Sequence, residues 1–149
     1  MARVFIDGHM FGCDWFLEVL PTLLSSKNVR FAYAPSQKLL GELGRVRKGL
    51  EFYRRMGDIG RRDDAPQVEA EGHIRFLTSQ RVWVDCSDCD DAHIFAIVFL
   101  KPVAFVFTED SRIARCRDRI NSEVSGRYCG FSLIKSSANF KIHRSAILN

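Results

Sequence analysis

Four acidic side chains, widely separated along the chain, have the types and local settings that could bind a divalent cation. Asp7 ends an apolar run near the N-terminus, Asp110 follows a second such run, Asp91 precedes an apolar segment, and Glu42 lies among leucines. Carboxylates brought together repel one another, and Mg²⁺ or Mn²⁺ neutralises them through oxygen ligands. Such an ion can polarise a phosphate and activate water. The acids therefore indicate metal-dependent phosphodiester hydrolysis, provided that the fold brings them together.

Short β-rich apolar runs alternate with segments of helical periodicity, and these predict the elements that position the acids. We expect strands over residues 3–7, 29–34, 81–84, 103–107 and 130–134, and helices over about 16–24, 36–46, 68–78, 92–100 and 111–120. Pro21 predicts a break or a new first turn in the first helix. Residues 56–66 combine glycine, charge and proline without periodicity, which predicts a flexible basic loop.

This alternation predicts a three-layer α/β/α sandwich with a mainly parallel central sheet. A chain of 149 residues with a hydrophobic fraction of 46% is expected to form one domain with a packed core. Ligands of such sheets bind outside the carboxyl ends of the strands, where Asp7 and Asp110 would lie. Each acid also has an ordinary alternative, as a helix-start residue, a turn residue or a solvated helix charge.

Positive charge is concentrated in one segment. Seven basic and two acidic residues between Arg45 and Arg62 give that segment a net charge of +5, whereas the whole chain carries +4. Clustered cations favour a polyanionic partner through phosphate neutralisation. We expect nucleic-acid contacts from the residues Arg45, Arg47, Lys48, Arg54 and Arg55, although a solvated basic helix face is an equally good interpretation. Tyr33, Phe52 and Tyr53 could stack on bases or belong to the core.

The segment DCDDAHIFAIVFLKPVAFVFTEDSRI resembles the second half of a PIN domain, and VFID and KLLGEL supply two further acidic positions in the expected order. The resemblance implies a PIN-like nuclease of the VapC-like ribonuclease type, with Asp7, Glu42, Asp91 and Asp110 as Mg²⁺ or Mn²⁺ ligands and Thr108 as a hydroxyl support. Asp88 and Asp90 lie close in sequence and are expected to act as outer ligands. The implied activity is endonucleolytic cleavage of RNA by metal-activated water.

PIN-like proteins supply the toxins of toxin–antitoxin and defence modules, so the resemblance also implies a possible homodimer and an inhibitory protein partner. One departure from the family stands beside Asp7, where Gly8 and His9 replace the usual Thr-Asn pair. This change supports an alternative, a catalytically weak PIN-like module that binds RNA or docks a partner.

The five cysteines form no obvious disulfide framework, so free thiols in a reducing compartment are expected. Cys86 and Cys89 have the spacing of a zinc half-site or a redox pair, but no second pair completes a zinc site. His93, on the predicted helix over 92–100, forms no H-E-x-x-H-type cluster with the other histidines. No apolar stretch is long enough to predict a membrane span, and a cytoplasmic location is expected.

Overall fold

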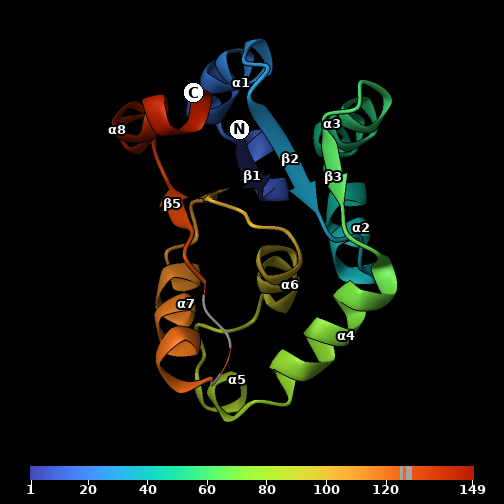
Figure 1. Cartoon of the computed structure of the whole chain (residues 1–149), viewed down its shortest axis with the longest axis vertical. Coiled ribbons are helices and arrows are strands. Elements are labelled where there is room, and N and C mark those ends of the chain that lie inside the picture. The colour runs from blue at the N-terminus through green and yellow to red at the C-terminus, as the bar shows by residue number, and fades with distance from the viewer. Residues whose placement is uncertain (125, 127–128) are drawn as a thin grey trace.

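The computed structural model describes residues 1–124, 126 and 129–149, which contain a five-stranded sheet with all neighbouring strands parallel (Figure 1). Its strands are β1 (Ala2–Ile6), β2 (Val29–Tyr33), β3 (Arg62–Asp64), β4 (Phe105–Phe107) and β5 (Ser132–Ile134), in the spatial order β3-β2-β1-β4-β5. β1 pairs with both β2 and β4 at the centre of the sheet. The expected parallel sheet is confirmed.

Helices cover both faces of the sheet. They are α1 (Asp14–Ser25), α2 (Gln37–Arg45), α3 (Arg47–Asp58), α4 (Gln67–Thr78), α5 (Arg81–Asp85), α6 (Ala92–Leu100), α7 (Arg112–Glu123) and α8 (Ser137–Leu148), with a short 3₁₀ helix, η1 (Gly8–Gly12), after β1. Aromatic contacts join α1 and α8 to β4 and α3 to β2. The predicted three-layer α/β/α sandwich is confirmed. Within the described residues, no helix is both long and apolar enough to cross a bilayer.

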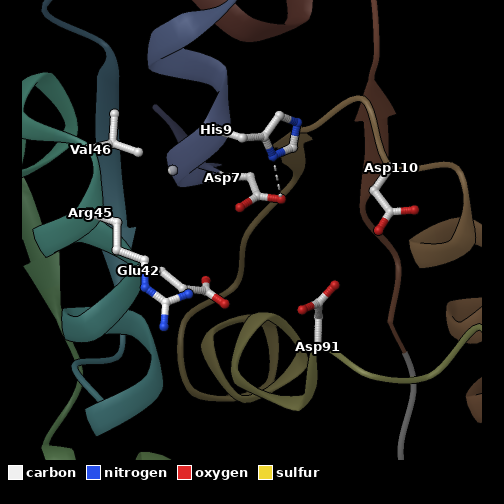
Figure 2. Close-up of a pocket in the computed structure, with 8 residues that line it drawn as sticks. Asp7, His9, Glu42, Arg45, Val46, Asp91 and Asp110 are labelled. Carbon is white, nitrogen blue, oxygen red and sulfur yellow. Dashed lines mark ion pairs between the residues drawn. The ribbon is translucent and has the colours of Figure 1, made fainter.

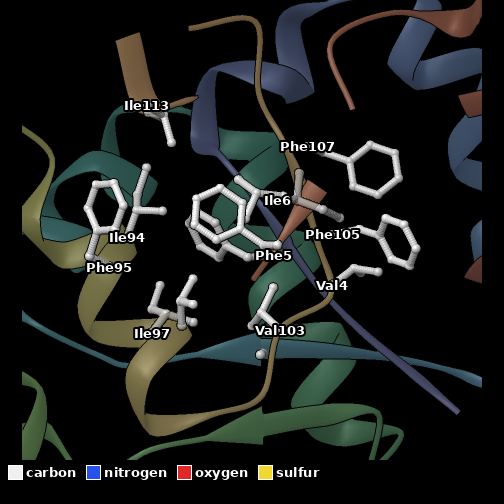
Figure 3. Close-up of a cluster of buried hydrophobic side chains, with 14 of the residues drawn as sticks. Val4, Phe5, Ile6, Ile94, Phe95, Ile97, Val103, Phe105, Phe107 and Ile113 are labelled. Carbon is white, nitrogen blue, oxygen red and sulfur yellow. The ribbon is translucent and has the colours of Figure 1, made fainter. Parts of the chain in front are cut away.

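The central strands send alternate side chains to opposite faces, as the two-residue period of a strand requires. Phe5 points toward Ile94 and Ile97 of α6, whereas Phe105 and Phe107 point to the other side of the sheet (Figure 3). Helix α6 packs between the sheet and α4, and seven of its nine residues are buried. This explains why the segment is apolar on nearly all sides rather than amphipathic.

Two local predictions were wrong. Residues 81–84, expected as a strand, lie in the short helix α5, where Val82 is buried but Val84 is 76% exposed. Their β propensity is overridden because Trp83 packs its ring against Phe95 of α6. Helix α1 also continues through Pro21, which lies on its exposed side, where the carbonyl left without an amide partner can be hydrated.

The predicted loop over 56–66 is a further correction, because it holds the last turn of α3 and the edge strand β3. Polar contacts hold this segment in place of apolar periodicity. The Arg61 guanidinium donates to four backbone carbonyls around the end of α1 and the start of β2. Asp63 accepts hydrogen bonds from Arg3 at 2.7 Å and Arg30 at 2.8 Å, which ties β3 to β1 and β2.

The expectation of five free thiols was also wrong. Cys89 and Cys116 form a disulfide, while Cys13, Cys86 and Cys129 are free. The Cys86-x-x-Cys89 spacing therefore produces neither a redox pair nor a zinc half-site here. The bond joins the loop before α6 to the middle of α7. Because this disulfide is present, the cysteines no longer indicate a reducing compartment.

Candidate metal centre

A cavity of about 290 Å³ lies at the carboxyl ends of β1 and β4, where the crossover connections leave the two strands in opposite directions. Such a switch point is the usual ligand site of a parallel α/β sheet. Figure 2 shows the four predicted acids directed toward this common space. The residues that line the cavity are Asp7, Gly8, His9, Glu42, Arg45, Val46, Asp91 and Asp110.

Asp7 is fixed in place by the end of the neighbouring strand. Its backbone N–H donates to the Phe107 carbonyl at 3.0 Å, and its side chain accepts a hydrogen bond from Thr108 Oγ1 at 3.0 Å. Thr108 is fully buried, and its hydroxyl oxygen also accepts from the Asp110 N–H at 3.2 Å. The Thr108 hydroxyl thus connects the first and last of the four acids.

His9, which follows β1, contacts both Asp7 and the turn after β4. Its Nδ1 lies 3.2 Å from Asp7 Oδ2, and its Nε2 accepts a hydrogen bond from the Glu109 N–H at 3.2 Å. The Asp7 carboxylate raises the pKa of His9 above its usual value, against the lowering effect of burial. This histidine therefore joins the turn after β1 to the turn after β4 and steadies Asp7 between them.

Glu42 reaches the cavity because α2 begins directly after β2. The Ser36 hydroxyl caps this helix by accepting from the Leu39 N–H at 3.1 Å, and Leu39 and Leu43 are buried. Glu42 then lies on the flank of the helix and meets the buried His93 of α6, with Glu42 Oε2 at 3.0 Å from His93 Nε2. The four-residue spacing from Lys38 to Glu42 places both side chains on one side of α2.

Asp91 stands at the N-cap of α6, yet its side chain makes no capping hydrogen bond. The ordinary interpretation of this acid as a helix cap therefore fails. Burial, and then the neighbouring Asp90 carboxylate, raise the pKa of Asp91 above its usual range. Lys38 Nζ is 3.4 Å from Asp91 Oδ1 and donates to the Asp90 carbonyl at 2.8 Å. A carboxylate in this setting would gain from a nearby cation.

Asp110 is held mainly by Arg112. The Arg112 guanidinium donates to both Asp110 oxygens, at 2.7 Å in the shortest contact, and reaches Asp90 Oδ2 at 3.1 Å. These hydrogen bonds lower the pKa of Asp110 and raise that of Arg112. Asp110 also accepts from the Arg112 backbone N–H, as a helix-start residue does. Asp88 instead pairs with Arg115 at 3.0 Å and does not line the cavity.

The described residues offer two groups of three side chains with ligand atoms within 4.8 Å of one another. One group is Glu42, Asp91 and His93, and the other is Asp90, Asp91 and Asp110. Asp91 belongs to both, whereas Asp7 belongs to neither. The structure therefore brings the four predicted acids to one cavity, but it places Glu42 and Asp110 in different groups and leaves Asp7 outside both. Sequence reasoning missed His93 as a member, although it is the one polar residue of an apolar helix, two positions after Asp91.

The five basic residues expected to contact nucleic acid are all exposed on α2 and α3. Arg45 lines the cavity with the acids, and Arg47 pairs with Glu51 on the next helical turn. The aromatic residues of this region belong to the protein interior instead. Tyr33 and Phe52 are buried, and Tyr53 lies under the Arg62 guanidinium, 3.9 Å from the ring centroid. Tyr33 and Phe52 are therefore core residues, as one of the two interpretations predicted, and the partly exposed Tyr53 ring is covered by Arg62.

Comparisons of this chain with protein-family models, with curated proteins and with solved structures found no match. The resemblance to PIN domains accordingly rests on the acidic motifs and on their order along the chain.

Proposed function

We propose that this protein is a PIN-like endoribonuclease that hydrolyses RNA phosphodiester bonds with a bound Mg²⁺ or Mn²⁺ ion. The observation that carries the proposal is the convergence of Asp7, Glu42, Asp91 and Asp110 on one cavity at the switch point of the sheet (Figure 2). These acids come from four distant segments of the chain. Helix capping explains only part of the bonding of Asp110 and none of that of Asp91.

The donor set fits a hard divalent cation. Carboxylate oxygens are the ligands that Mg²⁺ and Mn²⁺ favour, and Asp91 is shared by both groups of ligand atoms. A bound ion of this kind supplies Lewis-acid polarisation of the phosphate and lowers the pKa of a water molecule. Thr108 and His9 hold Asp7 in position, so the chain keeps this carboxylate oriented before the substrate arrives.

The basic residues define a path for the RNA. Arg45 lies on the cavity wall with Glu42 and is the cation placed to bind the phosphate at the cleavage position. Lys48, Arg54 and Arg55 are exposed along α3 and would bind neighbouring phosphates. In this reaction water would attack phosphorus and give up a proton to solvent, the bond between phosphorus and the ribose oxygen on the opposite side would break, and that oxygen would take up a proton from solvent.

A cleavage assay on end-labelled RNA tests the proposal. Wild-type protein should cut in Mg²⁺ or Mn²⁺ and stop in EDTA, and Asp7→Asn and Asp91→Asn should lose activity. Asp85→Asn is the matched control, because Asp85 is an exposed acid that pairs with Arg81 on α5 and should be dispensable. Cleavage that persists in EDTA, or in either active-site variant, would refute a metal-dependent nuclease.

A second candidate, a catalytically weak RNA-binding or partner-docking module, is favoured by Arg112. This guanidinium already neutralises Asp110 and Asp90, as an ion would. The module would bind RNA and show no turnover even at high Mn²⁺ concentration. The same assay, combined with a filter-binding measurement, separates the two functions.

We also propose that the protein is located in the cytoplasm and acts as the toxin of a toxin–antitoxin or defence module. In that role it would form a homodimer and have an inhibitory protein partner. The disulfide is compatible with the cytoplasm where a thiol pair responds to redox conditions. Size-exclusion chromatography with light scattering would test the dimer directly.

A further inference from the structure

His93 is a buried imidazole without a hydrogen bond. It is 1% exposed and is the one polar residue of α6. Its Nε2 lies 3.0 Å from Glu42 Oε2, but the pair lacks the alignment of a hydrogen bond, and neither ring nitrogen has a hydrogen-bond partner among the described residues. Burying an unpaired polar group costs free energy. A ligand bound through this ring would offset that cost.

The surroundings of the ring identify the chemistry of such a ligand. Glu42, Asp91 and His93 each offer one ligand atom, and these atoms lie within 4.8 Å of one another. Two ligand atoms on opposite sides of one ion, each about 2.1 Å from it, are about 4.2 Å apart. The three side chains would therefore need to move by less than about 1 Å to bind one ion. Two carboxylates and a neutral imidazole also match the charge of a divalent cation.

Of the two groups, this one is the less neutralised by cationic side chains. In the other, Arg112 already donates to both oxygens of Asp110 and to Asp90. In contrast, among the described residues, Lys38 is the one lysine or arginine side chain within 4 Å of the Glu42 or Asp91 carboxylate, at 3.4 Å from Asp91 Oδ1. An ion that enters the cavity therefore meets less competition beside His93.

We propose that Glu42, Asp91 and His93 form a mixed nitrogen–oxygen site that binds a first-row transition-metal ion, Mn²⁺ or Zn²⁺, in preference to Mg²⁺. An imidazole nitrogen favours transition metals, whereas Mg²⁺ favours oxygen ligands and retains its water. The inference rests on the proposed function in using two of the same acids, and it adds His93 as a direct ligand. The four acids alone suit both Mg²⁺ and Mn²⁺, and the His93 nitrogen shifts the preference of the site to Mn²⁺ or Zn²⁺.

Calorimetric titration of metal-free protein with Mn²⁺ and with Mg²⁺ tests this site without any RNA. Wild-type protein should bind Mn²⁺ at least about tenfold more tightly than Mg²⁺. His93→Gln should lose at least about tenfold in Mn²⁺ affinity, since loss of a mere outer partner already costs about 10- to 100-fold. Its Mg²⁺ affinity should change by less than about twofold. His143→Gln on α8, whose ring packs against Phe105, is the matched control and should bind like wild type.

A spectroscopic measurement on the wild-type protein guards against misfolding of the variant. Pulsed EPR of bound Mn²⁺ should show coupling to an imidazole nitrogen, and a purely structural histidine would give none. Absence of that coupling overturns the inference. If His93→Gln binds Mn²⁺ like wild type while Asp91→Asn binds none, the histidine site is wrong and the proposed acidic metal site survives. RNA cleavage without any Mn²⁺ preference also overturns the inference while it leaves the nuclease intact.

Discussion

Reduction of the Cys89–Cys116 disulfide should destabilise the protein and loosen the candidate metal centre at the same time. The bond spans a sequence separation of 27 residues. For a loop of that length, the loop-closure model predicts that breaking the bond lowers the free energy of unfolding by about 3.5 kcal/mol, because the unfolded chain regains conformational entropy. With an m-value of about 2 kcal/mol per M in urea, the unfolding midpoint should fall by about 1.7 M.

Urea unfolding with and without reductant measures this effect. In denaturant, thiol titration should count the free cysteines Cys13, Cys86 and Cys129 before reduction and all five cysteines after it. The double variant Cys89→Ser/Cys116→Ser is the matched control, because its midpoint should not respond to reductant. Equal midpoints for oxidised and reduced wild type would refute the reasoning.

Reduction of this disulfide should also affect the candidate metal centre. Cys89 lies two residues before Asp91, and its partner Cys116 lies on α7, which also carries Arg112. Reduction therefore frees the loop of Asp91 from the helix beside Asp110. We expect weaker Mn²⁺ binding by the reduced protein, measured by the same titration, and no such change in the double serine variant on adding reductant.

Three further predictions concern charges. Asp63→Asn should lower the free energy of unfolding by about 1–2 kcal/mol at pH 7, because it weakens charge-assisted hydrogen bonds. Arg30 lowers the folded-state pKa of this carboxyl, so the stability that the carboxylate contributes is present above about pH 4 and falls as the pH drops through the folded pKa. The difference between wild type and variant should therefore vanish in unfolding curves measured in acid. Arg54→Ala/Arg55→Ala should weaken RNA binding and reduce the slope of log affinity against log salt by about 1.4; an unchanged slope in filter binding would exclude this face. Arg112→Gln should tighten Mn²⁺ binding in calorimetry, because it frees the Asp90 and Asp110 carboxylates; unchanged or weaker binding would show that Arg112 does not compete with the ion.

Much of the fold could be predicted because the signals are local. The runs that became β1, β2, β4 and β5 are short, apolar and β-rich, and their places follow from composition alone. β3 was missed because it has three polar residues, Arg62–Asp64, held by ion pairs rather than by apolar burial. α5 was mistaken for a strand because local propensity cannot register the packing of Trp83 on Phe95.

Parts of the site were predictable for the same reason. Asp7 and Asp110 follow strands, and parallel strands of one sheet direct their carboxyl ends to the same edge. Cysteine pairing was not predictable, since connectivity depends on which segments meet in space. The partners of the acids also lay beyond sequence reasoning. Nothing local signals that Lys38 reaches Asp91 or that Arg112 reaches Asp90.

The sequence by itself determined the alternation of strands and helices, and it determined that acids stand where strands end and helices begin. Only the tertiary structure decided that β1 lies beside β4, which makes Asp7 and Asp110 neighbours across the switch point. It also decided the rotation of α6 that buries His93 against Glu42. The physical reason is that strand order and helix rotation follow from burial of side chains far apart in sequence, and no local pattern records those contacts.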